Sequence, residues 1–120
     1  LSFLSQLIQP KTILEIGTYT GYATLCLAEG LLENGLIHTI EINEELLDFQ
    51  QKHFNKSIYK DKIICHHGDA KEIIPNINSE FDLALFNQNI FTRKPVVYFS
   101  IVADFSKFCF KVAFFPKRLI

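Results

Sequence analysis

The sequence has few cysteines, few glycines and no long hydrophobic run, and each shortage excludes a class of protein. Its three cysteines are an odd number without C-x-x-C spacing, which argues against a disulfide scaffold or zinc ribbon. Five glycines in 120 residues exclude a collagen-like chain. The longest apolar stretches, residues 96–103 and 108–115, are much shorter than the ~20 residues of a membrane-spanning helix. With a formal net charge of −1, we expect a cytoplasmic protein that binds neither membrane nor nucleic acid.

The apolar content is sufficient for one globular domain. Hydrophobic residues make up 48% of the chain and charged residues 21%, with a mean hydropathy of +0.15. The charges are unevenly distributed, since residues 1–85 hold six Lys/Arg and twelve Asp/Glu. Residues 86–120 hold six Lys/Arg, one Asp and eight of the twelve Phe. We therefore expect residues 1–86 to form one part of a fold and residues 87–120 to be a diverged, Phe-rich basic tail.

Strand-like and helical patterns alternate along the first 86 residues. We expect strands at residues 12–16, 36–42, 62–65 and 81–86, and helices at 22–32, 43–56 and 70–74. Asn34-Gly35 is a typical turn, and Asn43 is a good N-cap for the second helix. This alternation predicts an α/β fold, a Rossmann-like parallel sheet with helices on both faces. After residue 87 the pattern fails, although residues 96–102 and 108–115 resemble strands in composition.

The loop after the first strand reads E-I-G-T-Y-T-G-Y, from Glu15 to Tyr22. Ligands of an open parallel sheet bind beyond the carboxyl ends of its strands, and Gly17 and Gly21 permit close approach to the backbone there. The loop lacks the lysine of a phosphate-binding P-loop and the middle glycine of a dinucleotide fingerprint. A nicotinamide-binding domain is therefore a disfavoured alternative.

Acidic residues at the strand ends favour a cationic nucleoside as the ligand. Glu41 follows Gly17 by 24 residues, close to the ~20 expected for a carboxylate that accepts from ribose hydroxyls. Glu15, beside the loop, would repel a pyrophosphate and favour a positive group. S-adenosylmethionine carries a sulfonium and an ammonium where other nucleotides carry phosphates. Asp69 could accept from an adenine amino group, with Ala70 as a small neighbour.

Four motifs in order resemble one known family. They are L-S-Q-L-I-Q-P-K-T-I-L-E-I-G-T-Y-T-G-Y, T-I-E-I-N, G-D-A-K-E-I-I-P and F-D-L-A-L-F. This run is similar to class I methyltransferases, in particular the metal-dependent O-methyltransferases of the caffeoyl-CoA and catechol type. The resemblance implies methyl transfer from S-adenosylmethionine to a hydroxyl of a small aromatic acceptor, with Mg²⁺, in a family whose members are often homodimers.

The resemblance also implies a set of cofactor-binding residues. They are Glu15, Gly17, Thr18, Gly21, Ala23, Glu41, Asp69 and Ala70. The family usually has serine where this chain has Ala23, which cannot make the hydrogen bond of a serine hydroxyl. A single neutral hydrogen bond contributes only about 1 kcal/mol, so cofactor binding is still expected.

The segment after the fourth strand departs from the family. Relatives read roughly I-D-A-D-K there, with a metal-binding Asp and a basic Lys, whereas this chain reads Phe86-Asn87-Gln88-Asn89-Ile90. Asn87, the candidate metal ligand, lacks the charge that Mg²⁺ favours, and Ile90 cannot accept a proton. Asp104 only faintly matches the later metal pair of the family. We assign no catalytic residue, and we expect a truncated methyltransferase fold with little or no turnover or, alternatively, a cofactor-binding remnant or pseudoenzyme.

Two further groups have a structural interpretation. His66 and His67 are neighbours in an extended segment and should point to opposite faces, so we do not expect them to chelate a metal together. Cys26 and Cys65 are expected to be buried structural thiols.

Overall fold

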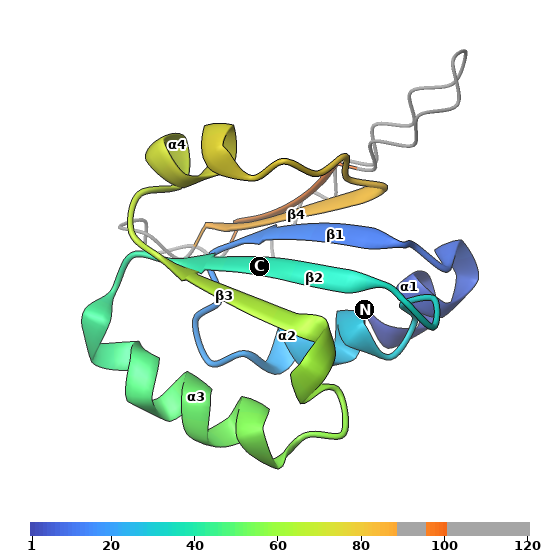
Figure 1. Cartoon of the computed structure of the whole chain (residues 1–120), viewed down its shortest axis with the longest axis horizontal. Helices are drawn as coiled ribbons and strands as arrows, with labels where there is room; N and C mark the ends of the chain where they lie inside the picture. The colour runs from blue at the N-terminus through green and yellow to red at the C-terminus, as the bar shows by residue number, and fades with distance from the viewer. Residues whose placement is uncertain (89–95, 101–120) are drawn as a thin grey trace, which may run out of the picture.

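The computed structural model describes the backbone of residues 1–88 and 96–100 and the side chains of residues 1–86. One five-stranded sheet of order β3-β2-β1-β4-β5 runs through it (Figure 1). Its strands are β1 (Thr12–Ile16), β2 (Leu36–Glu41), β3 (Ile63–His67), β4 (Leu83–Gln88) and β5 (Val96–Ser100). β1 to β4 are parallel, which confirms the predicted Rossmann-like sheet, and β5 pairs antiparallel with β4.

The sheet extends beyond residue 86, where the composition changes. β4 runs to Gln88, and the strand-like residues 96–100 pair with it from Ala84↔Ser100 to Gln88↔Val96. The division of the chain at residue 86 stays a prediction. The strand-like run 108–115, Ile90 and Asp104 lie outside the described residues.

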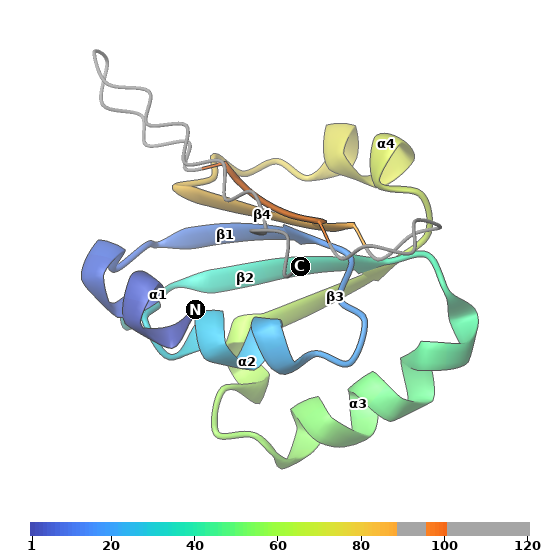
Figure 2. The same cartoon turned by 180° about the vertical axis from the view of Figure 1, so that it is seen from behind.

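Helices cover both faces of the sheet, as predicted. α2 (Tyr22–Ala28) and α3 (Leu47–Lys56) lie on one face and α4 (Ala70–Ile73) on the other (Figures 1 and 2). α1 (Ser2–Ile8) packs against α2. Short 3₁₀ turns η1 (Glu44–Leu46), η2 (Lys60–Lys62) and η3 (Ile74–Asn76) flank α3, β3 and α4. Asn43 caps η1 as expected, since its side chain accepts from the Glu45 N–H.

The helix expected at residues 22–32 is shorter than predicted and ends at Ala28. The cause is a close approach to α1, because a Cβ on Gly30 would lie 2.1 Å from the carbonyl carbon of Ser5. The buried Ser5 hydroxyl also donates to the Leu27 carbonyl at 2.6 Å, which satisfies one of the free acceptors at the helix end. The chain turns at this contact, and Leu31 enters the core from the loop.

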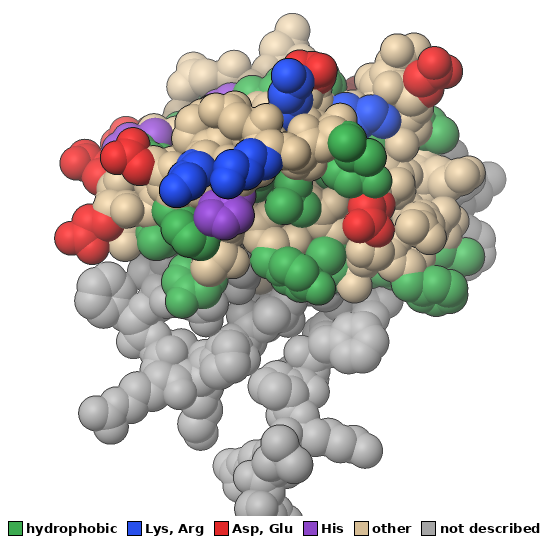
Figure 3. Space-filling model, turned by 90° about the horizontal axis from the view of Figure 1, so that it is seen from below, with side chains coloured by type: hydrophobic (Ala, Val, Ile, Leu, Met, Phe, Trp, Pro, Cys, Tyr) green, Lys and Arg blue, Asp and Glu red, His purple; other side chains and the backbone are tan. Residues whose placement is uncertain are grey.

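The core has two parts because successive strand residues point to opposite faces. The cluster under α2 contains Ile13, Leu27, Ala28, Leu31, Ile37, Leu83 and Leu85. The smaller cluster under α4 contains Leu14, Ile40 and Ala84, with Ile73 and Phe81 packed against it. On the outer surface of the face that carries α2 and α3, apolar side chains are interspersed with acidic and basic ones (Figure 3). Within the described ranges, no helix has the length and apolar character to cross a membrane.

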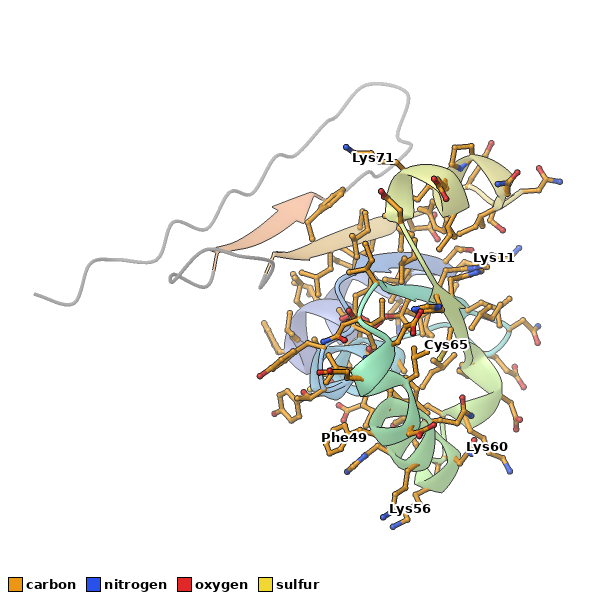
Figure 4. All side chains as sticks on the ribbon, turned by 90° about the vertical axis from the view of Figure 1, so that its left-hand side faces the viewer. Lys11, Phe49, Lys56, Lys60, Cys65 and Lys71 are labelled. Carbon is orange, nitrogen blue, oxygen red and sulfur yellow. The ribbon has the colours of Figure 1, made fainter. Side chains whose placement is uncertain are left out.

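The cysteine expectation is wrong for Cys65, which is exposed. This residue lies on β3, which is an edge strand of the sheet formed by the described residues (Cys65 is labelled in Figure 4). Cys26 on α2 is half-buried.

Candidate functional site

A cavity of about 90 Å³ opens at the carboxyl ends of β1, β2 and β3. Its walls come from the last residues of these strands and the residues just after them: Ile16 and Gly17; Ile40, Glu41 and Ile42; and Gly68, Asp69 and Ala70. Four of the predicted cofactor-binding residues thus line one cavity, namely Gly17, Glu41, Asp69 and Ala70. Parallel strands end at the same edge of a sheet, and this brings residues more than 50 positions apart into one site.

The first loop folds back over the end of β2. The N–H groups of Gly17 and Thr18 both lie against the Ile40 carbonyl, at 2.9 and 3.3 Å. Gly17 has φ 92°, a conformation that side chains disfavour, so glycine is required for the loop to turn at this point. The backbone of the loop therefore forms the cavity wall without a side chain in front of it.

Glu41 ties this loop to the end of the second strand. Its Oε2 accepts from the Tyr19 N–H at 2.8 Å, and its Oε1 accepts from the Asn43 N–H at 2.9 Å. The side chain is only 7% exposed and still lines the cavity. Each carboxylate oxygen has two lone pairs, so Glu41 retains capacity to accept from a ligand hydroxyl.

Gln50 is a residue of this site that the sequence reasoning missed. Its Nε2 donates to the Tyr19 carbonyl at 2.6 Å from α3, and the side chain is 3% exposed. Tyr19 itself has φ 52°, so this bond holds the loop in an unusual conformation. The available signal was helical spacing, because Gln50 precedes the buried Phe54 by four residues and shares its face.

Gly21 and Ala23 do not line the cavity. Gly21 has φ 81°, and a Cβ there would lie 2.6 Å from the ring of Phe54, so its lack of a side chain permits α2 to pack on α3. Ala23 is half-buried against the core cluster under α2. Their assignment as cofactor-binding residues stays a prediction, while packing accounts for both residue types.

Glu15 lies beneath the loop and not at its surface. The side chain is 0% exposed and does not line the cavity. Its Oε2 accepts from the hydroxyls of Thr24 (2.5 Å) and Thr39 (2.6 Å), whereas its buried Oε1 has no partner among the described residues. Burial raises the pKa of Glu15 from 4.5 to about 7, against the lowering effect of the two hydroxyls, and nearby Glu41 raises it further. Thr18 is buried as well and bonds to Thr39.

Asp69 begins α4 as its N-cap. Its Oδ1 accepts from the Lys71 N–H at 2.8 Å, and Ala70 is the first residue of the helix. Capping is the ordinary role of an aspartate at this position. The cap also fixes the carboxylate at the cavity wall, so the structural role is compatible with contact to a ligand.

The described residues do not offer a metal site. They contain no group of three or more His, Cys, Asp or Glu side chains that could hold an ion. His66 bonds to His38 instead, with 3.0 Å between Nε2 and Nδ1 and the rings stacked. The side chain of Asn87, the predicted metal ligand, lies outside the described part of the chain.

The parallel sheet and the cavity at its carboxyl edge place the chain in the Rossmann-like α/β class, whose members bind nucleotide-type ligands at this edge. The family model of O-methyltransferases matches residues 1–100. The chain belongs to that O-methyltransferase family, and the match extends past residue 86 through β5.

Individual relatives agree with this assignment. An O-methyltransferase of Aspergillus hancockii, hkm8, is 38% identical over 76 residues, which are 62% of this chain and 30% of that protein. A catechol O-methyltransferase of Niastella koreensis is 34% identical over 80 residues, 67% of this chain and 36% of that protein. The chain thus spans about a third of the length of these relatives.

Solved structures show the same fold. An O-methyltransferase from Bacillus cereus in complex with SAH (S-adenosylhomocysteine) superimposes with a TM-score of 0.67 at 31% identity, over 72% of this chain and 41% of that one. TomG from Streptomyces achromogenes, an O-methyltransferase of tomaymycin synthesis in complex with SAM (S-adenosylmethionine), gives 0.66 at 28% identity, over 71% and 40%.

Proposed function

We propose that the chain binds S-adenosylmethionine in the cavity at the ends of β1, β2 and β3, as part of an enzyme that methylates a hydroxyl of a small aromatic molecule. The observation that carries the proposal is the convergence of Gly17, Glu41 and Asp69 on one cavity. Support comes from the SAM and SAH named for the TomG and Bacillus cereus structures and from the catechol named for the Niastella relative.

Each lining residue has a chemically suitable role toward this cofactor. Glu41 accepts from the ribose hydroxyls through the lone pairs that its two backbone bonds leave free. Asp69 accepts from the adenine amino group, and Ala70 leaves room for the ring. Gly17 allows the ligand to approach the loop backbone. When bound, the cofactor supplies an electrophilic methyl group on a positively charged sulfur.

The charge of the site favours this ligand over a dinucleotide. Glu41 and Asp69 line the cavity and Glu15 is buried beneath the adjoining loop, so acidic groups surround the position where a Rossmann domain binds pyrophosphate. A sulfonium and an ammonium are attracted by these groups, whereas a pyrophosphate is repelled. Since the described residues do not fit a metal ion, no step of the proposal involves one.

Cofactor binding without turnover is the second candidate function. It is favoured by the sequence at the end of β4 and just beyond it, where Asn87 and Ile90 stand in place of the acidic and basic residues of the family motif. Methyl transfer to catechol, followed with Mg²⁺ present, separates the two candidates. We expect little or no product from the 120-residue chain, and steady turnover would exclude the binding-only function.

Calorimetric titration of the 120-residue chain with S-adenosylhomocysteine and with NADH tests the site itself. We expect binding of the former only, and Glu41→Ala should weaken it about tenfold or more, because it loses a charge-assisted acceptor. Glu33→Ala removes the same charge from an exposed turn at the other end of β2 and should leave affinity unchanged. Binding of NADH without S-adenosylhomocysteine would contradict the proposal.

A further inference from the structure

Gln50 is a polar residue at one of the two buried positions of α3. Among the ten residues of this helix only Gln50 and Phe54 are buried, and Gln50 is 3% exposed. A buried amide is unfavourable unless it is hydrogen-bonded, and an apolar side chain of similar size would pack at this position without that cost. The residue type is therefore explained by its partner, the Tyr19 carbonyl in the loop of residues 17–21, which we call the cofactor loop.

The bond between Gln50 and Tyr19 has only one possible direction. A carbonyl oxygen accepts hydrogen bonds and cannot donate them, so the amide nitrogen of Gln50 must face it, and 2.6 Å separate Nε2 from this oxygen. Position 50 therefore requires a side chain that carries a donor. Gln51, the next residue of the helix, is exposed and bonds to Asn55 within α3 instead.

Tyr19 needs this support because its backbone is left-handed. It has φ 52°, a conformation that residues with a side chain disfavour, and its own side chain is half exposed. Its N–H donates to Oε2 of Glu41 at 2.8 Å, and its carbonyl accepts from Gln50. Only the rotations φ and ψ of Tyr19 lie between these two groups, so the bonds to β2 and α3 together restrict both rotations.

We propose that Gln50 is a positioning residue of the cofactor site, which acts through the backbone of Tyr19 and, through it, on Glu41. The inference rests on the proposed function, in which Glu41 accepts from the ribose hydroxyls. If Tyr19 leaves its left-handed conformation, the Glu41 carboxylate loses one of the two backbone donors that fix it at the cavity wall. Gln50 thereby links α3 to the ligand-binding edge of the sheet.

The effect on affinity follows from the population of the loop conformation that binds. The apparent dissociation constant rises in proportion as the fraction of chains in that conformation falls. Because the left-handed conformation of Tyr19 is unfavourable by itself, loss of the Gln50 bond should lower this fraction. One hydrogen bond corresponds to a change of about fivefold in such an equilibrium.

Three substitutions separate positioning of the loop from general stability in titrations with S-adenosylhomocysteine. Gln50→Leu, which keeps the size but removes the donor, should weaken binding about fivefold. Gln51→Leu makes the same change at the exposed neighbour and should alter affinity less than about twofold. Leu31→Ala opens the core beside Gly35, at the amino end of β2, and should destabilise the fold with equally little effect on affinity. No loss in Gln50→Leu, or an equal loss in Leu31→Ala, would overturn the proposal.

Gln50→Glu adds a pH profile that a general loss of stability would not produce. A neutral carboxylic acid can donate its proton to the Tyr19 carbonyl, whereas a carboxylate can only accept. Burial favours the neutral form at low pH. The affinity of Gln50→Glu relative to wild type should therefore fall several-fold from pH 5 to pH 8.5, while that of Gln50→Leu relative to wild type stays constant. A ratio for Gln50→Glu that does not fall with pH would refute the donor role of Gln50.

Amide hydrogen exchange in the ligand-free chain tests the same inference without the cofactor. The Tyr19 amide should exchange about fivefold faster in Gln50→Leu than in wild type. The Gly68 amide, which donates to the Glu41 carbonyl at 2.9 Å outside the loop, should exchange at the wild-type rate. If the wild type does not bind S-adenosylhomocysteine, the proposed function is wrong, and the exchange of Tyr19 still decides the role of Gln50. Unchanged exchange of Tyr19, or an equal increase at Gly68, would show that Gln50 does not position the loop.

Discussion

Replacing Glu15 with glutamine should remove a pH dependence from the stability of the fold. The pKa of this carboxyl rises from 4.5 to about 7 on folding, chiefly because burial disfavours the charged form. The folded state therefore binds the proton more tightly than the unfolded state. The stability that this proton binding by Glu15 adds to the free energy of unfolding is fully present below pH 4.5. It decreases as pH rises toward 7 and does not change further above that. A shift of this size corresponds to about 3 kcal/mol.

The assay is urea unfolding of both chains, followed by circular dichroism between pH 4.5 and 8.5. Relative to wild type, Glu15→Gln should gain about 3 kcal/mol between the two ends of this range. His38 and His66 titrate in the same range with the opposite sign, since burial lowers their pKa, but both chains contain them and the difference cancels their effect. A difference that stays constant within about 0.5 kcal/mol would refute the buried, proton-binding state of Glu15.

Three further predictions concern the packing around the loop. Gly21→Ala should lower the free energy of unfolding by about 2–4 kcal/mol, because the added Cβ would meet the ring of Phe54 and the backbone has a positive φ. A loss below about 0.5 kcal/mol in thermal unfolding would contradict this. Gln50→Ala should lower the free energy of unfolding by about 1–3 kcal/mol, because it leaves the Tyr19 carbonyl without this donor. The same substitution at the exposed neighbour Gln51 should lower it by less than about 0.5 kcal/mol. Equal losses in urea unfolding would argue against the Gln50 bond. The imidazole of His66 should titrate below pH 6.5 in an NMR pH series, because burial lowers its pKa, and a midpoint above that value would contradict its half-buried pairing.

The parallel part of the sheet could be predicted because its signals are local. Short β-rich runs, the turn at Asn34-Gly35 and the cap at Asn43 each depend on neighbouring residues, and all appear in the structure. The end of α2 could not be predicted in this way. It depends on Gly30 meeting Ser5, a contact across 25 positions that no periodicity in the sequence encodes. The antiparallel pairing of β5 is likewise a property of the sheet and not of residues 96–100 alone.

The sequence predicts which strand ends form the candidate site, but it does not predict the role of each residue there. Gly17, Glu41 and Asp69 lie at or just after the carboxyl ends of strands and line the cavity, as the topology requires. Gly21 has the same residue type as Gly17 but serves the contact with Phe54, because it begins α2 and faces α3. Strand alternation does not determine whether a residue near the carboxyl edge lies above or below the loop that covers it.

Glu15 and Glu41 illustrate what this distinction means for the chemistry. Both are acids at or near the carboxyl ends of neighbouring strands, and charge alone suggests that both face the ligand. Glu41 is the last residue of β2, so its carboxylate accepts backbone N–H groups at the cavity wall and can serve a ligand from there. Glu15 lies one residue before the end of β1 and points under α2, where the loop covers it and the hydroxyls of Thr24 and Thr39 replace solvent. The same residue type therefore lines the cavity at the end of one strand and is buried beneath the loop in the next, and in the register of the sheet the two positions differ by two residues, because Glu15 pairs with Thr39.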